Sequence, residues 1–273
     1  MIDAHQHFWR INEHDCAWPT PALAAIYRDF EPHQLEPLAA PLGVEGSVLV
    51  QTQESDRDTD WLCQLAARTP FVKSVVGWAD LAAPHAAARI AELARREKLR
   101  GLRPMLQGMA DDAWIADTRR AAALEAMIAH DLRFDALVFT RHLPALRAMA
   151  QRHSDLLIVI DHAAKPPIAS GALDPWREEI AALARRPNVF CKLSGLLTEA
   201  GERRSAEALK PYVDHLMNVF GPSRLMWGSD WPVLLLAGEY PHWLDLALQL
   251  TRARGADADS IFCGAARAFY RIP

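Results

Sequence analysis

Apolar runs alternate with segments of helical spacing along the whole chain, and this alternation constrains the fold more than any other feature. We predict eight strands from the apolar runs and a helix from most of the segments between them. The predicted strands cover residues 2–6, 46–51, 72–81, 99–106, 132–139, 156–161, 188–194 and 224–228. The predicted helices cover residues 59–68, 84–98, 117–130, 144–152, 174–185, 205–220 and 241–254, and a closing helix covers residues 259–270.

Such an alternation of strand and helix implies parallel strands joined by right-handed crossovers. Eight such units within 273 residues have the size of a closed barrel. An open doubly wound sheet is the main alternative, but it more often shows a glycine-rich phosphate turn, which this sequence lacks. No repeat or linker divides the chain. We therefore expect an α/β protein with a single domain, residues 1–273, folded as a (β/α)8 TIM barrel.

Two local predictions depend on prolines. Residues 12–41 contain five prolines, so we expect this stretch to be irregular. A long loop beside the first strand either covers a pocket or is an ordinary surface excursion. Asp174 is expected to cap the helix at residues 174–185, with Pro175 at its first helical position.

Polar and titratable side chains gather at the ends of the apolar strands. His5 and His7 project to the same side, because residues two apart in a strand share a face. In a (β/α)8 barrel the active site lies at the C-terminal ends of the strands. The residues that we expect there are His5, His7, Gln51, Gln53, Glu54, Trp78, Asp80, Arg103, Asp161, His162, Lys165, Lys192, Ser194, Asp230 and Trp231. Their clustering predicts a functional site, because any one of them alone could be structural.

Most of these residues also have a structural interpretation. The histidine pair could be two histidines with satisfied hydrogen bonds, and Asp230 could be a turn residue. Arg103 could pair with Glu54 or Asp80. The tryptophans could be packing residues.

The two lysines of the set raise separate questions. Lys165 precedes two prolines, so its segment could be no more than a rigid loop. Lys192 lies within a buried strand and needs an anion nearby. Asp161 and Glu199 are the candidates for that anion, or the lysine meets the substrate.

Charge and cysteine content narrow the classes of partner. The formal net charge of −4 at pH 7 gives no case for nucleic acid or an anionic membrane. The four cysteines are far apart and form no Cys-x-x-Cys pair, so we expect reduced thiols and a cytoplasmic protein. No signal peptide is expected, and no stretch reaches the roughly 20 apolar residues of a membrane span. A small molecule remains the expected partner, and the oligomeric state stays open.

Five motifs stand within or at the ends of the predicted strands: His5-Gln-His7-Phe-Trp9, Arg103, Asp161-His-Ala-Ala-Lys165-Pro, Cys191-Lys-Leu-Ser-Gly195 and Gly228-Ser-Asp-Trp-Pro232. Together they resemble the amidohydrolase superfamily, and within it the group of sugar lactonases that includes 2-pyrone-4,6-dicarboxylate lactonase. The resemblance runs through all eight predicted strands and implies a (β/α)8 barrel that hydrolyses lactones.

The resemblance implies a role for each matching residue. Asp230 is expected to activate the hydrolytic water as a general base, and His162 to face the same water or the substrate carbonyl. His5 and His7 match a pair that binds a divalent metal in metal-dependent relatives. Arg103 matches a position that holds substrate oxygens.

The metal question stays open at this point. Metal-dependent relatives usually add a lysine or glutamate on the fourth strand or a histidine on the fifth. Here the fourth strand offers Arg103, which stays protonated and is a poor ligand. We expect either one divalent ion, such as zinc, on His5, His7 and Asp230, or catalysis without a metal.

A sugar lactone such as L-fucono- or L-rhamnono-lactone is the expected substrate. Its hydroxyl groups call for hydrogen-bonding and aromatic side chains in the pocket. The residues that we expect to bind it are Trp9, Gln51, Trp78, Asp80 and Trp231. The alternatives are a pyrone dicarboxylate lactonase, a zinc-dependent decarboxylase that would want the missing fifth-strand histidine, and a non-catalytic binding protein.

Overall fold

The structure, a computed structural model, describes residues 1–252 and 258–273. Its eight strands form one parallel sheet in which each strand pairs with the next along the chain. The strands are β1 (Ile2–Gln6), β2 (Gly46–Val50), β3 (Val72–Gly77), β4 (Leu99–Leu102), β5 (Arg133–Ala136), β6 (Ile158–Ile160), β7 (Val189–Leu193) and β8 (Leu225–Trp227). The predicted (β/α)8 barrel is confirmed.

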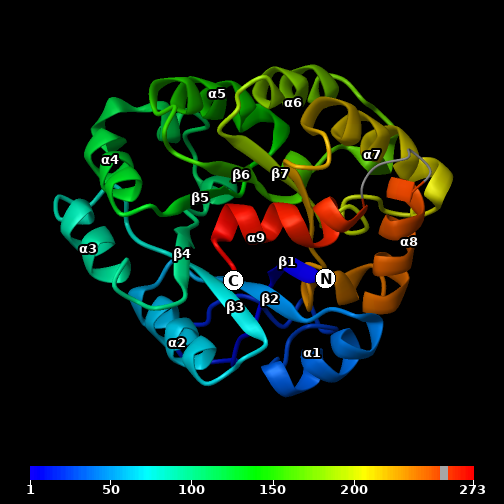
Figure 1. Cartoon of the computed structure of the whole chain (residues 1–273), viewed down its shortest axis with the longest axis horizontal. Helices are drawn as coiled ribbons and strands as arrows, with labels where there is room; N and C mark the ends of the chain where they lie inside the picture. The colour runs from blue at the N-terminus through cyan, green and yellow to red at the C-terminus, as the bar shows by residue number, and fades with distance from the viewer. Residues whose placement is uncertain (253–257) are drawn as a thin grey trace.

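Helices surround the sheet, as Figure 1 shows in a view along the barrel axis. They are α1 (Pro32–Ala39), α2 (Asp56–Ala67), α3 (Ala86–Leu93), α4 (Ala121–Ala129), α5 (Leu143–Arg152), α6 (Trp176–Ala184), α7 (Ala206–Phe220), α8 (Tyr240–Arg252) and α9 (Ala265–Tyr270). The main apolar core includes residues of both the strands and these helices. Residues 253 and 254 of the predicted eighth helix lie outside the described residues.

The barrel closes where β1 meets the segment that follows β8. The amide of His7 donates to the carbonyl oxygen of Trp231 at 2.8 Å, and the amide of Asp230 donates to that of His5 at 2.8 Å. These bonds join two parts of the chain that are more than two hundred positions apart. They place the first and last catalytic candidates side by side.

The C-terminal helix α9 crosses the barrel near the start of β1 (Figure 1). Its residues Phe269 and Tyr270 belong to the apolar cluster that fills the barrel interior, together with Ile2 at the start of β1. The backbone carbonyl of Phe269 accepts a 2.5 Å hydrogen bond from the guanidinium of Arg133 at the start of β5. Helix α9 therefore closes the N-terminal end of the barrel and leaves the opposite end for a site.

Two local predictions were wrong. Residues 12–41 are not irregular throughout, because α1 forms there with Pro32 in its first turn and Pro37 inside it. Proline is tolerated in a first turn, where its missing N–H has no helical partner. Asp174 does not cap α6, because the helix begins one residue later than predicted, at Trp176, and Pro175 is in the N-cap position instead of the first helical position. The Asp174 carboxylate instead binds the Arg177 guanidinium at 2.6 Å.

Several elements are shorter in the structure than the ranges predicted from the sequence. Helix α3 is shorter than the predicted range 84–98, and a 3-10 turn, Thr118–Arg120, precedes α4 within the predicted range 117–130. The closing helix was predicted as one element, but a π-helical turn, Ser260–Gly264, precedes α9. No described helix is both long and apolar enough to cross a membrane. All four cysteines are free thiols, as predicted.

A buried carboxyl group in α2 makes the stability of the fold depend on pH. Burial raises the pKa of Asp58 from its ordinary value of 3.8 to about 7. The folded state then keeps a proton that the unfolded chain releases, so the free energy of unfolding falls as pH rises from about 4 to about 7. The variant Asp58→Asn does not titrate. We expect its stability relative to the parent protein to increase across this window by about 4 kcal/mol.

Urea unfolding at pH 4 and pH 8 measures this difference. The variant Asp155→Asn, at an exposed position, is the control and should show no such trend. A difference between Asp58→Asn and the parent protein that stays constant with pH would contradict the assignment.

Candidate active site

The first strand and the segment after the last strand bring two histidines and a carboxylate together. His5 and His7 project from the C-terminal end of β1, and their Nε2 atoms lie 3.1 Å apart. The Oδ1 atom of Asp230 lies 3.2 Å from His7 Nε2 and 3.7 Å from His5 Nε2. All three side chains are almost completely buried. The spatial proximity expected from the sequence is therefore present.

The hydrogen bonds of His7 fit these three residues to a metal ion. Its Nδ1 donates to the carbonyl oxygen of Val50 at 2.7 Å, because a carbonyl can only accept. In the neutral ring, Nε2 is then unprotonated and points at the Asp230 carboxylate and His5. The ligand atoms of His5, His7 and Asp230 converge within 4.8 Å of one another, which suits a divalent cation, and two histidines with one carboxylate are typical of catalytic zinc.

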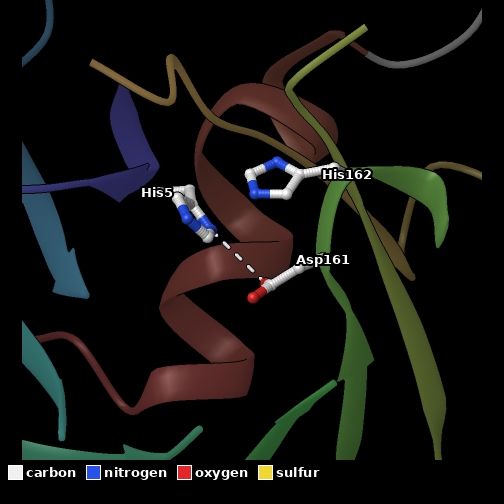
Figure 2. A group of neighbouring side chains, drawn as sticks. All are labelled: His5, Asp161 and His162. Atoms are coloured by element: carbon white, nitrogen blue, oxygen red, sulfur yellow. Dashed lines mark ion pairs between the residues drawn. The ribbon is translucent and has the colours of Figure 1, made fainter. Parts of the chain in front are cut away.

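The second nitrogen of His5 faces charged groups rather than this centre. His5 Nδ1 lies 3.3 Å from Asp161 Oδ1, as the dashed line in Figure 2 shows, and 3.1 Å from Lys192 Nζ. Because Nδ1 faces these buried charged groups, Nε2 is the ring nitrogen that can bind a cation. Asp161 also forms an ion pair with Lys192 at 3.0 Å and accepts a hydrogen bond from Arg103 at 3.2 Å. Because two cations already neutralise it, Asp161 is a poorer metal ligand than Asp230.

Arg103 immediately follows β4 and is 3% exposed. Its guanidinium contacts Asp161 and donates to the backbone carbonyl of Gln51, while Nη1 lies 3.4 Å from His5 Nε2. The sequence left Glu54 or Asp80 as its structural partners, but the barrel wall brings Asp161 closer. The arginine is held rigidly beside the histidines, where it can stabilise negative charge on a substrate oxygen.

His162 lies at the end of β6, close to the first two histidines. Its Nε2 is 3.8 Å from Asp230 Oδ1, and its Nδ1 is 2.9 Å from Ser194 Oγ. Gly195, with φ of +66°, packs so closely on the imidazole that an added Cβ would lie 2.7 Å from Nδ1. The glycine after Ser194 is therefore needed for the position of this ring.

Lys192 is fully buried on β7 beneath the histidines. Its ammonium lies 2.6 Å from Asp135 and 3.0 Å from Asp161. Asp161 was one of the anticipated anions, whereas Glu199 was wrong, because Glu199 pairs with Lys165 at 3.5 Å. Asp135 also accepts from the Tyr270 hydroxyl at 2.6 Å. This buried group connects helix α9 to the floor of the site.

Burial determines the charges of the site at neutral pH. Burial lowers the pKa of His162 to about 4, and burial together with Lys192 holds the pKa of His5 well below its ordinary value. Both rings are therefore neutral, as coordination of a metal ion requires. Burial would raise the pKa of Asp230, but His162 and the other histidines hold it below its usual range. Asp230 is an anion that can accept a proton.

A pocket of about 390 Å³ opens above these groups. Its wall combines titratable, polar and apolar side chains: His7, Trp18, Thr52, Arg103, Met105, Gln107, Leu137, His162, Lys165, Thr198, Glu199, Asp230, Val233 and Leu236. A larger hollow of about 830 Å³ lies beside it and shares Thr52, Met105 and Gln107, but none of the histidines lines it. The chemistry therefore belongs to the smaller pocket. Its size suits a small molecule.

The five residues expected to bind substrate do not line this pocket. Trp9 and Trp231 are buried against Phe30, and Gln51 is buried with its amide donated to the Arg103 carbonyl. Trp78 and Asp80 line two neighbouring hollows instead. Side chains that follow a strand can turn into the wall or away from the mouth, and their spacing in the sequence does not distinguish these directions.

Other wall residues were missed or given no role. Thr52, Gln107 and Thr198 come from loops whose course is not visible in the sequence. Trp18 comes from the 12–41 segment, which is tied to the rim because Gln53 donates to the Trp18 carbonyl at 2.6 Å. This segment therefore contributes to the pocket. Asp135 had a visible signal, since an acid within an apolar strand needs a partner.

A (β/α)8 barrel with this histidine and aspartate arrangement defines a hydrolase of the amidohydrolase type. A family model described as Amidohydrolase matches residues 2–272, and the chain belongs to this family. The resemblance noted in the sequence is confirmed.

Curated relatives narrow the comparison. The L-fucono-1,5-lactonase of Burkholderia ambifaria is 54% identical over 276 residues, which cover 99% of this chain and 95% of that protein. The L-fucono-1,5-lactonase of Burkholderia multivorans is 39% identical over 285 residues, which cover 100% of this chain and 96% of that protein. A crystal structure of a Burkholderia multivorans amidohydrolase with bound zinc is 39% identical, with a TM-score of 0.93 and coverage of 100% and 99%.

Proposed function

We propose that this protein hydrolyses a sugar lactone, and that L-fucono-1,5-lactone is its substrate. The observation that carries the proposal is the position of Asp230, an anionic carboxylate beside three histidines at the floor of a small pocket. The two lactonase relatives support the choice of substrate. The pocket also offers an acid, Glu199, among its cations, which suits a polyhydroxylated ring better than a pyrone dicarboxylate.

The reaction opens a cyclic ester with water. Asp230 takes a proton from a water molecule that attacks the lactone carbonyl carbon, because it is the anionic acceptor nearest to His7 and His162. Arg103 donates to the oxygen on which negative charge develops, and one good donor of this kind contributes about 3 kcal/mol. The proton held by Asp230 then passes to the ring oxygen as the C–O bond breaks. The product is an open-chain hydroxy acid, whose carboxyl group releases its proton to solvent to give the carboxylate.

His5, His7 and Asp230 would hold one divalent metal ion. When bound, the ion supplies Lewis-acid polarisation of the lactone carbonyl. The roles of this chain's own residues remain the same: His7 keeps its orientation through Val50, and Asp161 orients His5. A decarboxylase would want a histidine on the fifth strand, whereas β5 carries Asp135, which turns to Lys192.

A panel of aldonolactones tests the substrate. With a pH indicator, we expect the purified protein to release acid fastest from L-fucono-1,5-lactone, well above the spontaneous hydrolysis measured without protein. Rates at the spontaneous level for every lactone of the panel would overturn the proposal. Carbon dioxide release from an aromatic acid would favour the decarboxylase instead.

Metal removal is the next prediction. We expect about one zinc ion per chain, and dialysis against a chelator should lower lactone turnover by at least about tenfold, with recovery on zinc addition. Metal content measured by mass spectrometry and activity measured on the same sample give both values. Full turnover by a zinc-free sample would show that the histidines and Arg103 polarise the carbonyl without a metal.

The setting of the enzyme is also part of the proposal. We propose a cytoplasmic protein whose partner is the lactone alone, with no nucleic acid or membrane partner. Free thiols at all four cysteines and a net charge of −4 support this placement. Fractionation of cells that express the protein tests it.

A further inference from the structure

The segment after β6 has an unusual backbone. Four consecutive residues, His162, Ala163, Ala164 and Lys165, have φ between 51° and 60°. This left-handed conformation is unfavourable for residues with a Cβ, and it rarely persists beyond a single residue. The surroundings hold it in place, since the Ala163 carbonyl accepts from Trp176 Nε1 at 2.7 Å and the Lys165 amide donates to the His162 carbonyl at 2.8 Å. Backbone strain of this kind is concentrated at functional sites.

The left-handed turn determines where Lys165 points. In a tight helical turn, residues three apart lie on the same face. His162 and Lys165 are three apart, and both side chains line the 390 Å³ pocket. The ammonium lies 5.3 Å from the centre of the Phe139 ring, which supports it from one side. The strained turn therefore places the side chains of His162 and Lys165 on the same wall of the pocket.

Glu199 lies beside Lys165 on the same wall. Its Oε1 is 3.5 Å from Lys165 Nζ, longer than a good charge-assisted hydrogen bond of about 2.8 Å. The exposed fractions of the two side chains are 20% and 26%, so both reach the solvent-filled pocket. The Glu199 backbone carbonyl accepts from the Ala169 amide at 3.1 Å, which fixes its loop next to the turn. The Lys165 ammonium can therefore still donate, and the Glu199 carboxylate still accept, hydrogen bonds with a ligand.

A purely structural ion pair does not account for this arrangement. A partly exposed pair at this distance stabilises a protein little, whereas four left-handed residues are costly. The pair is also absent from the reaction described above, because neither group reaches the Asp230 floor with a hydrogen bond. A pair of opposite charges at a pocket wall instead matches a hydroxyl group on each of two neighbouring carbons, one accepting from the ammonium and one donating to the carboxylate.

We propose that Lys165 and Glu199 determine substrate specificity by binding two adjacent hydroxyl groups of the lactone ring. This inference rests on the proposed lactone hydrolysis and specifies which part of the pocket wall binds the hydroxyl groups of the sugar. Lys165 donates to one hydroxyl oxygen, and Glu199 accepts the O–H of the next. Binding at this wall leaves the carbonyl free to face Asp230 and Arg103.

Kinetics of Lys165→Met and Glu199→Gln on L-fucono-1,5-lactone test the assignment. We expect KM to rise about tenfold in each variant while kcat changes less than about threefold, because these bonds form with the substrate as well as with the transition state. The matched control is Glu179→Gln, which alters a similar pair, since Glu179 is 29% exposed and 3.7 Å from Arg147. Its KM should equal that of the parent protein.

Deoxy lactones identify the hydroxyl groups. One of the 2-, 3- and 4-deoxy lactones lacks the hydroxyl group that Glu199 binds. On that lactone the Glu199→Gln variant and the parent protein should have the same KM, because the bond to Glu199 is already missing. An unchanged KM in both variants, or an equal loss on every deoxy lactone, would overturn the inference. Unfolding temperatures confirm that the variants are folded.

A binding measurement separates this inference from the proposed function. L-fucose presents the same ring hydroxyls but contains no lactone, and its binding is followed by thermal shift of the parent protein and the variants. A parent protein that hydrolyses no lactone but binds L-fucose, with loss in Lys165→Met, overturns the reaction and supports the sugar-reading pair. A parent protein that hydrolyses the lactone, with L-fucose binding in both variants equal to that of the parent, supports the reaction and overturns the role of Lys165 and Glu199.

Discussion

Replacing Asp230 with asparagine is expected to lower kcat/KM for L-fucono-1,5-lactone by about a thousandfold, the usual contribution of a general base. The amide has the shape of the carboxylate but cannot take a proton from water. Asparagine also tolerates the left-handed φ of +59° at this position, so the backbone should not change. Initial rates with a pH indicator, together with an unfolding temperature, measure both effects.

Two further measurements make this result specific. Asp155→Asn, at an exposed position, should keep full activity. Zinc content of Asp230→Asn shows how much of the loss comes from a weaker metal site, since the same carboxylate is a candidate ligand. Turnover by Asp230→Asn within a factor of two of the parent protein would rule out Asp230 as the base.

Replacing Lys192 with methionine is expected to reduce the free energy of unfolding by about 3–5 kcal/mol, the cost of leaving a buried charge without its partner. Methionine fills similar space but removes the ammonium that lies 2.6 Å from Asp135 and 3.0 Å from Asp161. Both carboxylates and the lysine are fully buried, so water cannot replace the lost charge. Urea unfolding at pH 7 measures the change.

A surface lysine and a double variant test the reason for this loss. Lys210→Met removes an ion pair whose lysine side chain is 47% exposed, and should cost less than about 1 kcal/mol. Adding Asp135→Asn to Lys192→Met should recover part of the stability, because Asp135, which loses its lysine partner in Lys192→Met, is then replaced by a neutral side chain. Equal stability of Lys192→Met and Lys210→Met would contradict the buried network.

The order of the strands was predictable because each buried parallel strand is a short apolar run that shows directly in the sequence. The ends of elements were less predictable. Helix α1 forms despite Pro37, since burial of Leu35 and Ala39 outweighs the missing hydrogen bond. The predicted cap of α6 was wrong because the helix begins one residue later, at Trp176, which puts Pro175 in the N-cap position.

For the site, the groups expected at its centre are together, whereas the residues expected to bind substrate are elsewhere. His5, His7, His162 and Asp230 follow strand ends, and the barrel topology alone brings such positions to one rim. The wall residues Lys165 and Glu199 depend on a left-handed turn and a loop. No periodic pattern in the sequence encodes either feature.

The sequence by itself determined the barrel, the family resemblance and the titratable groups at its floor, because strand periodicity and strand ends are local properties of the chain. Only the tertiary structure decided which nitrogen of each histidine faces the centre, which acids neutralise Lys192, and which side chains form the pocket wall. Those choices depend on hydrogen bonds between residues far apart in sequence, such as His7 with Val50 and Lys192 with Asp135. Their geometry exists only after the sheet has closed.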